Sequence, residues 1–381
     1  MNPEKGIKER YLILWPVLIL CIFITGSCID TFKPQLKDYH PLIVVDALLT
    51  DEDLSSYVYL SGTIKDPKDN PKKVTDAYIE IRDDVGNKVV LTEIATGKYR
   101  TDSLTFRGVP GRTYTLYIRT RDGKEFESEP CRLNHSRGID TIYFAKGTEV
   151  AGNGVDNIQG VYLFFDSKDQ SESRYFRWVY EEWWEFRTPY PRMYNYINSK
   201  NIVEIEPEKD TCWKNVKSGE IILQSAEETV NDEFIKKPVM FIPSEASDRL
   251  LIQYYVHAKQ YAISRREYEF WEQMKMITES GGDIFDKQPF QIVSNIHGIN
   301  GTEDKVLGFF QVAGVSDRQL YLTRREVDLM NLPMYDYGCE LLFINPGTVP
   351  VQLDPPVTFD KIYALMTGMH YIFVMPVYSD L

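Results

Sequence analysis

The pattern of apolar and polar positions between residues 40 and 133 predicts a series of short β-strands. Apolar and β-branched residues alternate with polar ones in short runs, and Gly, Pro, Asn and Asp separate the runs. Runs of this kind with turn residues between them are typical of antiparallel strands. They cover residues 42–48, 57–63, 77–82, 88–93, 113–120 and 124–128. Because no helical period interrupts them, we expect residues 40–133 to form a small β-sandwich domain.

The pattern of apolar and polar positions in residues 139–381 predicts a larger β-rich domain. Its clearest strand pattern covers residues 174–187. From 176 to 186 the even positions are apolar apart from Glu182, and the odd positions from 175 to 185 are mixed. A period of two places the even set in a core and the odd set on the outer face of a sheet. Trp183 is therefore a candidate exposed platform for a ligand, and a Trp covered by a neighbouring loop is the alternative. Further strand patterns cover 139–145, 161–166, 220–224, 239–242, 250–259, 306–313 and 320–324.

One amphipathic helix is predicted inside this second domain, at about residues 264–280. Ser264 and Glu267 match the capping-box pattern, in which the Ser accepts from the backbone and the Glu reaches back. A Gly pair at 281–282 supplies a stop. An aromatic stripe that includes Trp271 lies between these signals at helical spacing. Because such a stripe is usually part of a core, we expect this helix to pack on the sheet.

The N-terminus has a different pattern, typical of a secretory signal. Residues 1–10 carry three basic side chains, residues 11–25 are almost wholly apolar, and small residues precede Cys28. This ending resembles a bacterial lipobox, in which the Cys after two small residues is acylated on sulfur and becomes the new N-terminus. We therefore predict a lipoprotein signal peptide at 1–27, a lipid on Cys28 and a polar tether at 28–39. A signal anchor and a cleaved signal without lipid remain alternatives.

Composition narrows the classes of partner. The chain has 43 Lys and Arg residues against 56 Asp and Glu residues, a formal net charge of −13 at pH 7. Such a chain repels phosphate backbones and has no basic stripe, so we expect no nucleic acid partner. Aromatic residues make up 13% of the chain. They favour strands and are also used by glycan-binding and protein-binding surfaces, so their abundance does not distinguish structure from recognition.

Three tyrosines follow the strand at 174–187 in a Pro-containing loop, at Tyr190, Tyr194 and Tyr196. Together with Trp183 they are candidate ligand-binding aromatics. Packing of the loop against its own domain is the alternative. Clustering of these rings on one exposed face would favour glycan binding, because flat aromatic rings can stack on sugar rings.

Cysteine usage allows one disulfide at most. Cys21 leaves with the signal and Cys28 takes the lipid, which leaves Cys131, Cys212 and Cys339. The compartment beyond the inner membrane permits disulfides. We predict a bridge between Cys212 and Cys339, with three buried thiols as the alternative. The absence of a C-x-x-C pair excludes a zinc ribbon and a thioredoxin-type site.

The sequence offers no recognisable catalytic set. Its five His residues are not at metal-ligand spacing, and H-E-x-x-H, G-x-S-x-G, S-x-x-K and the phosphate-binding glycine loops are absent. Carboxylate pairs such as Glu181 and Glu182 occur, but an acidic chain has many of them by chance. We therefore predict no catalytic residue, no metal site and no cofactor.

Part of the first domain resembles a known type of module. The order of Asp76–Ile81, Gly97–Tyr99 and Gly108–Leu116 is similar to that in carboxypeptidase-regulatory-like and transthyretin-like sandwiches. In those modules the first segment is a core strand, and the last leads into another. The resemblance implies that residues 40–133 are an Ig-like or transthyretin-like β-sandwich. Modules of this type usually act as spacers or present other domains rather than catalysing reactions.

The second half of the chain carries a stronger resemblance. The segments are Tyr175–Trp178, Thr211–Trp213, Tyr268–Trp271, Ser294–Ile296 and Val306–Phe310. With the lipobox and the first sandwich, their order and spacing resemble the Bacteroidota lipoproteins catalogued as domain of unknown function 4249 (DUF4249). Members are often encoded beside TonB-dependent outer-membrane receptors, which implies a role at such receptors. The acidic cluster that often follows the lipidated Cys in surface-exported lipoproteins of this phylum is reduced here to Asp30.

Together these observations predict a mainly β, non-enzymatic lipoprotein of the bacterial cell envelope, anchored in the outer membrane through its N-terminal lipid. Both the periplasmic and the surface face of that membrane remain open. The predicted role is a binding or accessory component of a TonB-dependent receptor system. A surface glycan-binding lipoprotein is the alternative, and a hydrolase is a third, less favoured one.

Overall fold

The computed structural model describes residues 41–329 with internal gaps, and beyond them the backbone of three strands. The gaps are 67, 103–105, 137, 151–153, 155–156, 168–172, 188–193, 198–200, 205–210, 229–237, 245–246 and 280–291. For the strands within 194–204 and 340–377, only the backbone is described. The predicted signal peptide at 1–27, Cys28 and the rest of the tether at 28–39 lie outside the described residues.

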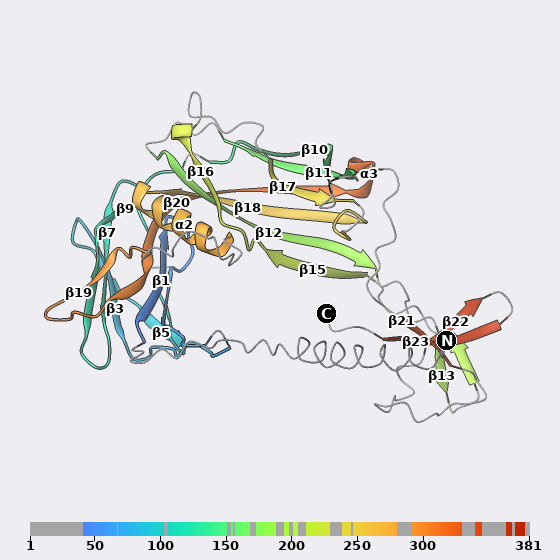
Figure 1. Cartoon of the computed structure of the whole chain (residues 1–381), viewed down its shortest axis with the longest axis horizontal. Coiled ribbons are helices and arrows are strands. Elements are labelled where there is room, and N and C mark those ends of the chain that lie inside the picture. The colour runs from blue at the N-terminus through green and yellow to red at the C-terminus, as the bar shows by residue number, and fades with distance from the viewer. Residues whose placement is uncertain are drawn as a thin grey trace, which may run out of the picture. The chain divides into compact units, whose positions relative to one another are not determined.

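Two sheets form a β-sandwich from the first part of the chain (Figure 1). One sheet has the order β1 (Ile43–Thr50), β2 (Tyr57–Gly62), β6 (Lys98–Arg100), β5 (Thr92–Ala95). The other has the order β19 (Ile296–Ile299), β8 (Glu125–Ser128), β7 (Thr113–Arg119), β3 (Tyr78–Asp83), β4 (Lys88–Val90), with β9 (Cys131–Arg132) beside β7. Both sheets contribute side chains to one buried cluster that includes Val45, Leu60, Ile81, Leu116 and Phe126. The predicted sandwich-type β-fold is confirmed, and the kinship with transthyretin-like modules stays a resemblance.

The second part of the chain builds another two-layer arrangement around a separate core. One layer has the order β15 (Thr211–Lys217), β12 (Tyr175–Arg187), β18 (Gln253–Ile263), β20 (Val306–Thr323), with β16 (Ile222–Ser225) beside β12. The other layer has the order β10 (Thr141–Val150), β11 (Asn157–Asp166), β17 (Pro238–Pro243). The core between them contains Trp178 and Val256 from the first layer and Leu163, Phe165 and Ile242 from the second.

The alternation predicted for residues 174–187 is confirmed in β12. Phe176 and Trp178 are fully buried, and the one polar member of the even set, Glu182, is only 2% exposed. A buried carboxylate is costly unless it is paired. Glu182 is paired twice, because the Tyr254 hydroxyl donates to it at 2.7 Å and the Arg249 Nε lies 3.0 Å away. Glu182, the polar exception in the sequence pattern, therefore forms an ion pair with Arg249 inside the core.

A single long strand, β20, belongs to both sandwiches. Its first half pairs parallel with β1, from Val306 opposite Ile43 to Ala313 opposite Thr50. Its second half pairs antiparallel with β18. The two strands predicted at 306–313 and 320–324 are therefore one, which corrects the prediction. As a result one sheet runs through both parts of the chain, in the order β15-β12-β18-β20-β1-β2-β6-β5.

The first core also depends on residues from the far end of the chain. Ile296 of β19 and Val306, Phe310 and Val312 of β20 are buried in the same cluster as the strands of residues 40–133. The boundary at 133–139 between domains of 40–133 and 139–381 stays a prediction. The structure adds that a complete first sandwich includes β19 and the first half of β20.

The predicted helix at 264–280 is present as α2 (Arg265–Glu279), which lies against β12 and β20 (Figure 1). The Glu267 backbone N–H donates to Ser264 Oγ at 3.1 Å, as the capping pattern predicts. The Phe270 ring packs on Phe309 with centroids 4.9 Å apart. The Glu267 carboxyl does not complete the capping box, because it is buried and turned toward the backbone of Val312.

The remaining described elements are short. They are η1 (Ala226–Glu228), α3 (Arg324–Val327), the pair β13 (Tyr194–Ile197) and β14 (Asn201–Glu204), and the sheet of β21 (Glu340–Ile344), β23 (His370–Val377) and β22 (Tyr363–Thr367). Thr323 and Glu326 form a complete capping box on α3. Within the described part of the chain, no helix has the length and apolar character needed to cross a membrane.

The pairing of β1 with β20 requires a glycine at position 308, and this can be tested. Gly308 has φ +102°, and a Cβ atom there would lie 1.8 Å from the Val45 carbonyl oxygen. We expect Gly308→Ala to lower the free energy of unfolding by about 3 kcal/mol or more. The new Cβ atom would push β1 and β20 apart, and the alanine would also be strained at this positive φ. Urea denaturation measures the change.

Gly111→Ala is the matched control for this prediction. Gly111 also has a left-handed backbone, with φ +88°, but nothing lies within 4 Å of a Cβ atom there. We expect Gly111→Ala to lower the free energy of unfolding by about 1–2 kcal/mol, because only the backbone strain contributes. If the two variants unfold at the same urea concentration, the close approach of β1 to β20 is wrong.

Candidate functional site

One face of the nine-stranded sheet points away from the second core, and we call it the outer face. It carries the odd-numbered side chains of β12 and their partners on β18 and β20, because directly paired residues of antiparallel strands point to the same side. The register places Trp183 opposite Tyr255, and Tyr255 opposite Tyr321. Further along the same face α2 covers Tyr175, whose ring lies 5.1 Å from that of Tyr268.

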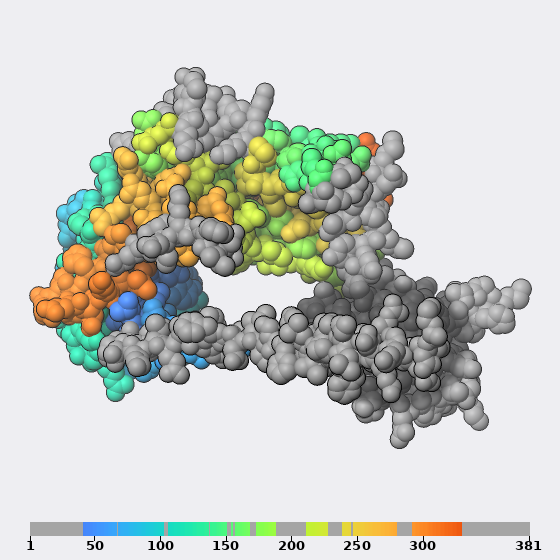
Figure 2. All heavy atoms as spheres, in the orientation of Figure 1, coloured from blue at the N-terminus to red at the C-terminus, as the bar shows by residue number. Residues whose placement is uncertain are grey.

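Four rings gather at one end of the outer face, and we call them the aromatic patch: Trp183, Trp213, Tyr255 and Tyr321. The Trp183 and Tyr255 ring centroids are 5.2 Å apart. Trp213 lies opposite Glu185 and therefore diagonal to Trp183. Trp213 and Tyr321 are 54% and 50% exposed. In Figure 2 the surface around β15, in yellow-green, is open to view beside the orange surface of the region around α2.

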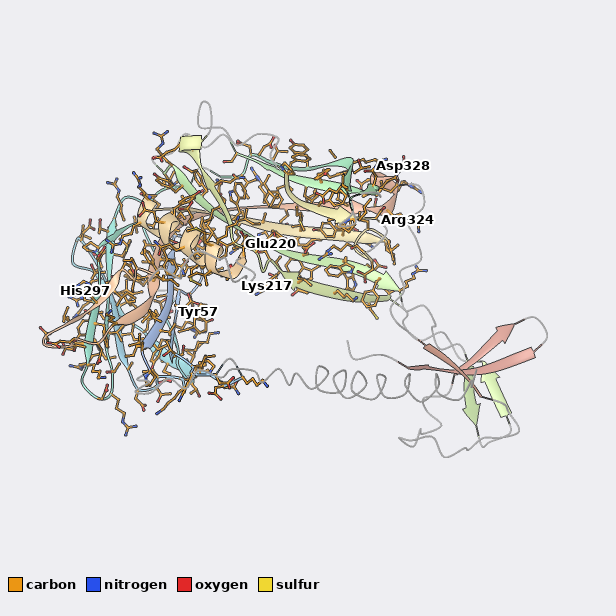
Figure 3. The ribbon with its side chains drawn as sticks, viewed as in Figure 1. Tyr57, Lys217, Glu220, His297, Arg324 and Asp328 are labelled. Atoms are coloured by element: carbon orange, nitrogen blue, oxygen red, sulfur yellow. The ribbon has the colours of Figure 1, made fainter. Side chains whose placement is uncertain are left out.

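Between the aromatic patch and α2, the outer face carries charged side chains. It includes a cavity of about 360 Å³ lined by Lys217, His257 and Lys259, and Figure 3 shows Lys217 at the end of β15. His257 Nε2 lies 2.9 Å from a carboxylate oxygen of Asp317. Lys259 Nζ lies 2.5 Å from Glu52, which belongs to the loop after β1. This ion pair connects the β18 part of the outer face to the β1 part.

The outer face also has a cavity of about 590 Å³ between α2 and strands β1 and β2. Tyr57 and Tyr59 from β2 form one wall, and Trp271 from α2 forms another. Asp46 from β1 and Gln311 from β20 provide polar atoms to it. Tyr57 is labelled on its strand in Figure 3. We call this hollow the α2 cavity.

Arg177 of β12 also lines the α2 cavity and is held in a fixed orientation. Its guanidinium carbon lies 4.8 Å from the ring centroid of Tyr261 and 4.4 Å from that of Trp271. Its Nη2 donates to Gln311 Oε1 at 3.3 Å, and Gln311 Nε2 donates to Asp46 Oδ1 at 3.4 Å. A planar guanidinium stacked on rings presents its N–H groups in a defined plane.

Two carboxyl groups take part in the electrostatics around Arg177. Glu267, on the helix, is completely enclosed, and burial raises its pKa to about 7, although Arg177, Trp271 and the Val312 backbone partly counter this effect. Asp46 keeps exposed surface, but partial desolvation beside the cavity raises its pKa, and the positive charge of Arg177 partly counters that shift. The site therefore combines one fixed cation with acids that are less acidic than usual.

This arrangement is suited to recognition. Small-molecule sites are concave, with aromatic walls and a few placed polar groups, and have volumes of roughly 300–1,000 Å³. The α2 cavity has these properties. The described residues contain no cluster of three or more His, Cys, Asp or Glu side chains that could hold a metal ion.

The carboxylate pair Glu181 and Glu182 does not share a cleft. Successive residues of a strand point to opposite faces. Glu182 is paired with Arg249 in the core, whereas the Glu181 carboxylate accepts from Asn215 on the outer face. These two carboxylates therefore cannot act on one bound substrate.

The other predicted site residues have different outcomes. Trp183 lies on the outer face as predicted, half-buried by its contact with Tyr255. Tyr190 lies outside the described residues, and Tyr194 and Tyr196 lie on β13, whose side chains are not described. Cys212 lies half-buried on β15. Its partner Cys339 is outside the described residues, as is Cys28, so the disulfide and the lipid stay predictions.

Sequence reasoning did not single out the residues of the α2 cavity. Arg177 was one of the odd, outward positions of residues 174–187, so its exposure to the outer face could have been predicted. Nothing in the sequence indicated that Asp46 and Gln311 lie beside it, because the parallel pairing of β1 with β20 brings them together. Trp271, expected to be core, is half-buried and lines the cavity.

The fold and this site define a mainly β protein with two sandwiches that share one sheet and carry an aromatic-lined cavity on one face. The family described as domain of unknown function (DUF4249) matches residues 29–319, and the chain belongs to this family.

The other comparisons add little. No curated protein matches the chain. Among solved structures, trypsin-activated alpha-2-macroglobulin from Escherichia coli is 10% identical over 60% of this chain, with a TM-score of 0.18. This chain covers 15% of that one. A likeness of this size carries no argument about fold or function.

The burial of Glu267 predicts a pH dependence of stability. Because its pKa of about 7 in the folded protein lies above the ordinary value of 4.5, the folded chain binds this proton more tightly than the unfolded chain. The contribution of Glu267 to stability is therefore complete at acidic pH and is lost as the pH rises to about 7. The loss is about 3 kcal/mol. We expect Glu267→Gln to exceed wild type in stability above neutral pH and to match it near pH 4.5.

Urea unfolding at a series of pH values measures this difference. Glu269→Gln is the control, because Glu269 lies on the same helix, is exposed and pairs only with the exposed Arg265. Its stability should follow the wild-type pH profile. Parallel profiles for Glu267→Gln and wild type would contradict the assignment of a buried carboxyl with a raised pKa.

Proposed function

We propose that this chain is a non-enzymatic binding protein of the bacterial cell envelope, held in the outer membrane by a lipid on Cys28. Its partner binds the outer face of the nine-stranded sheet. The observation that carries the proposal is the presence on this one face of the aromatic patch and of a cavity of about 590 Å³. Tyr, Trp and Arg are the residues enriched at the centres of binding surfaces.

The first partner that we propose is a TonB-dependent outer-membrane receptor. Support comes from membership of DUF4249 and from the genomic neighbourhood that the family resemblance implies. Two proteins tethered in one membrane have a high effective concentration, so a contact that is weak in solution can still operate there. The chain therefore needs only a moderate interface to act as an accessory component.

The aromatic patch favours a second candidate, glycan binding. Trp213 and Tyr321 expose about half of their surface, and Trp183 and Tyr255 lie between them. The four rings lie on adjacent strands, with Trp183 and Tyr255 tilted by 57° to each other, and the faces of aromatic rings attract the polarised C–H groups of a sugar. Glu181 and Asn215 flank the rings with hydrogen-bonding groups.

The lipid anchor is tested by fatty-acid labelling of cells. We expect the wild-type chain to incorporate labelled fatty acid and Cys28→Ala to incorporate none, because the thiolate is the acylated group. Mass spectrometry of the mature protein should find no residue of the segment 1–27. Equal labelling of wild type and variant would contradict the anchor.

The receptor proposal is tested by crosslinking in intact cells, because detergent extraction dilutes a weak contact. We expect the lipidated chain to recover an outer-membrane receptor, and Trp213→Ala to reduce recovery about tenfold or more, as truncation of an exposed aromatic hot spot does. Val90→Ala, an exposed apolar residue on β4, is the control and should have no effect.

The glycan candidate gives a different result in a second assay. The full-length chain in detergent should bind polysaccharide, and Trp183→Ala should weaken that binding while leaving the melting temperature close to that of wild type. If crosslinking recovers no receptor and polysaccharide binding is lost in Trp183→Ala, glycan binding replaces receptor association as the proposed function.

A further inference from the structure

The α2 cavity has a chemistry different from that of the aromatic patch. It has two aromatic walls, Tyr57 with Tyr59 on β2 and Trp271 on α2. Tyr57 and Tyr59 are stacked with centroids 6.2 Å apart, and Lys98 Nζ lies over both rings, 4.6 Å and 5.3 Å from their centroids. Lys98 therefore restrains both rings of the β2 wall, and Tyr59, which is 41% exposed, keeps surface available to a ligand.

Charge at the cavity disfavours both anions and cations. An anion meets the carboxylates of Asp46 and Glu52, and a cation meets the guanidinium of Arg177. Lys259 already neutralises Glu52 at 2.5 Å. What remains is one acid and one base on the same wall, connected through Gln311 by hydrogen bonds of 3.3 Å and 3.4 Å. A neutral ligand brings no charge of its own close to Asp46 or Arg177, so neither of these charged groups repels it.

The polar groups of the cavity match hydroxyls. A hydroxyl both donates and accepts, so neighbouring hydroxyls can donate to the Asp46 carboxylate and accept from the Arg177 guanidinium. The two internal hydrogen bonds through Gln311 are long, at 3.3 Å and 3.4 Å, so shorter hydrogen bonds from ligand hydroxyls to the same charged groups can replace them. The aromatic walls are at the same time suited to an apolar face of the ligand. A sugar ring has an apolar C–H face and a rim of hydroxyls.

We propose that the α2 cavity binds one ring of a neutral saccharide, which stacks on Tyr59 and hydrogen-bonds to Asp46, Arg177 and Gln311. The inference rests on the proposed role of the outer face in binding, and it adds a site that is separate from the aromatic patch. The cavity volume of about 590 Å³ accommodates a single ring with part of a second. A polysaccharide can then lie on the patch while its end enters the cavity, or a short sugar can bind alone.

The test uses the full-length chain in a detergent without a sugar head group. Saturation-transfer NMR is carried out with glucose, galactose, mannose, N-acetylglucosamine, maltose and cellobiose, and the quenching of Trp fluorescence gives affinities. We expect at least one of these sugars to bind. Asp46→Asn should weaken binding about tenfold or more, the value of a hydrogen bond to a charged group. Tyr59→Ala should weaken it by about threefold to tenfold, because the stacking contact with the sugar ring is lost. Both positions are exposed, so both variants should fold, and their melting temperatures verify this.

Tyr321→Ala is the matched control. Tyr321 and Tyr59 are 50% and 41% exposed tyrosines of the same sheet, and Tyr321 lies in the aromatic patch. Its substitution should leave binding of the short sugars unchanged. If none of the six sugars binds, the proposal is wrong. If Tyr321→Ala abolishes binding and Tyr59→Ala does not, the patch is the sugar site and the α2 cavity is not, which leaves the proposed function standing. Receptor crosslinking is scored separately and is unaffected by either outcome.

Discussion

The parallel pairing of β1 with the first half of β20 is the contact on which the rest of the structure depends. It joins residues 43–50 to residues 306–313. The sheet is therefore complete only when a late segment of the chain pairs with its first strand. Gly308 allows the approach, because a side chain there would meet the backbone of Val45. Since the second half of β20 pairs with β18, the two cores share one hydrogen-bonded sheet.

This shared sheet explains how the candidate site is assembled. Asp46, Arg177 and Gln311 come from β1, β12 and β20, which are distant in sequence and neighbours only through the sheet. The helix α2 then covers part of the outer face and leaves a cavity on its β1 side and the aromatic patch at the far end of β12 and β18. The α2 cavity is therefore a property of the complete sheet, and neither predicted domain contains it alone.

Much of the local structure could be predicted from the sequence. Alternation identified β12, the inward position of Glu182 and the outward position of Trp183, because a strand with one buried face has a period of two. The continuity of β20 could not be predicted. Its first half is buried on both faces and has no alternation, and a polar stretch at 316–319 separates it from the second half. Parallel pairing between distant segments leaves no local signal in the sequence. The α2 cavity depends on this pairing and therefore could not be predicted either.

Thiol labelling in cells tests most directly whether the outer face is a binding face. Gln319→Cys places a thiol at an exposed position beside the aromatic patch, and Val90→Cys places one on an exposed strand of the other sheet. With a membrane-permeable maleimide, and with labelling of the wild-type chain subtracted, we predict that the cysteine at 319 is protected in intact cells and reacts freely in the purified protein, whereas the cysteine at 90 reacts equally in both. Equal reactivity of the cysteine at 319 in cells and after purification would contradict the account.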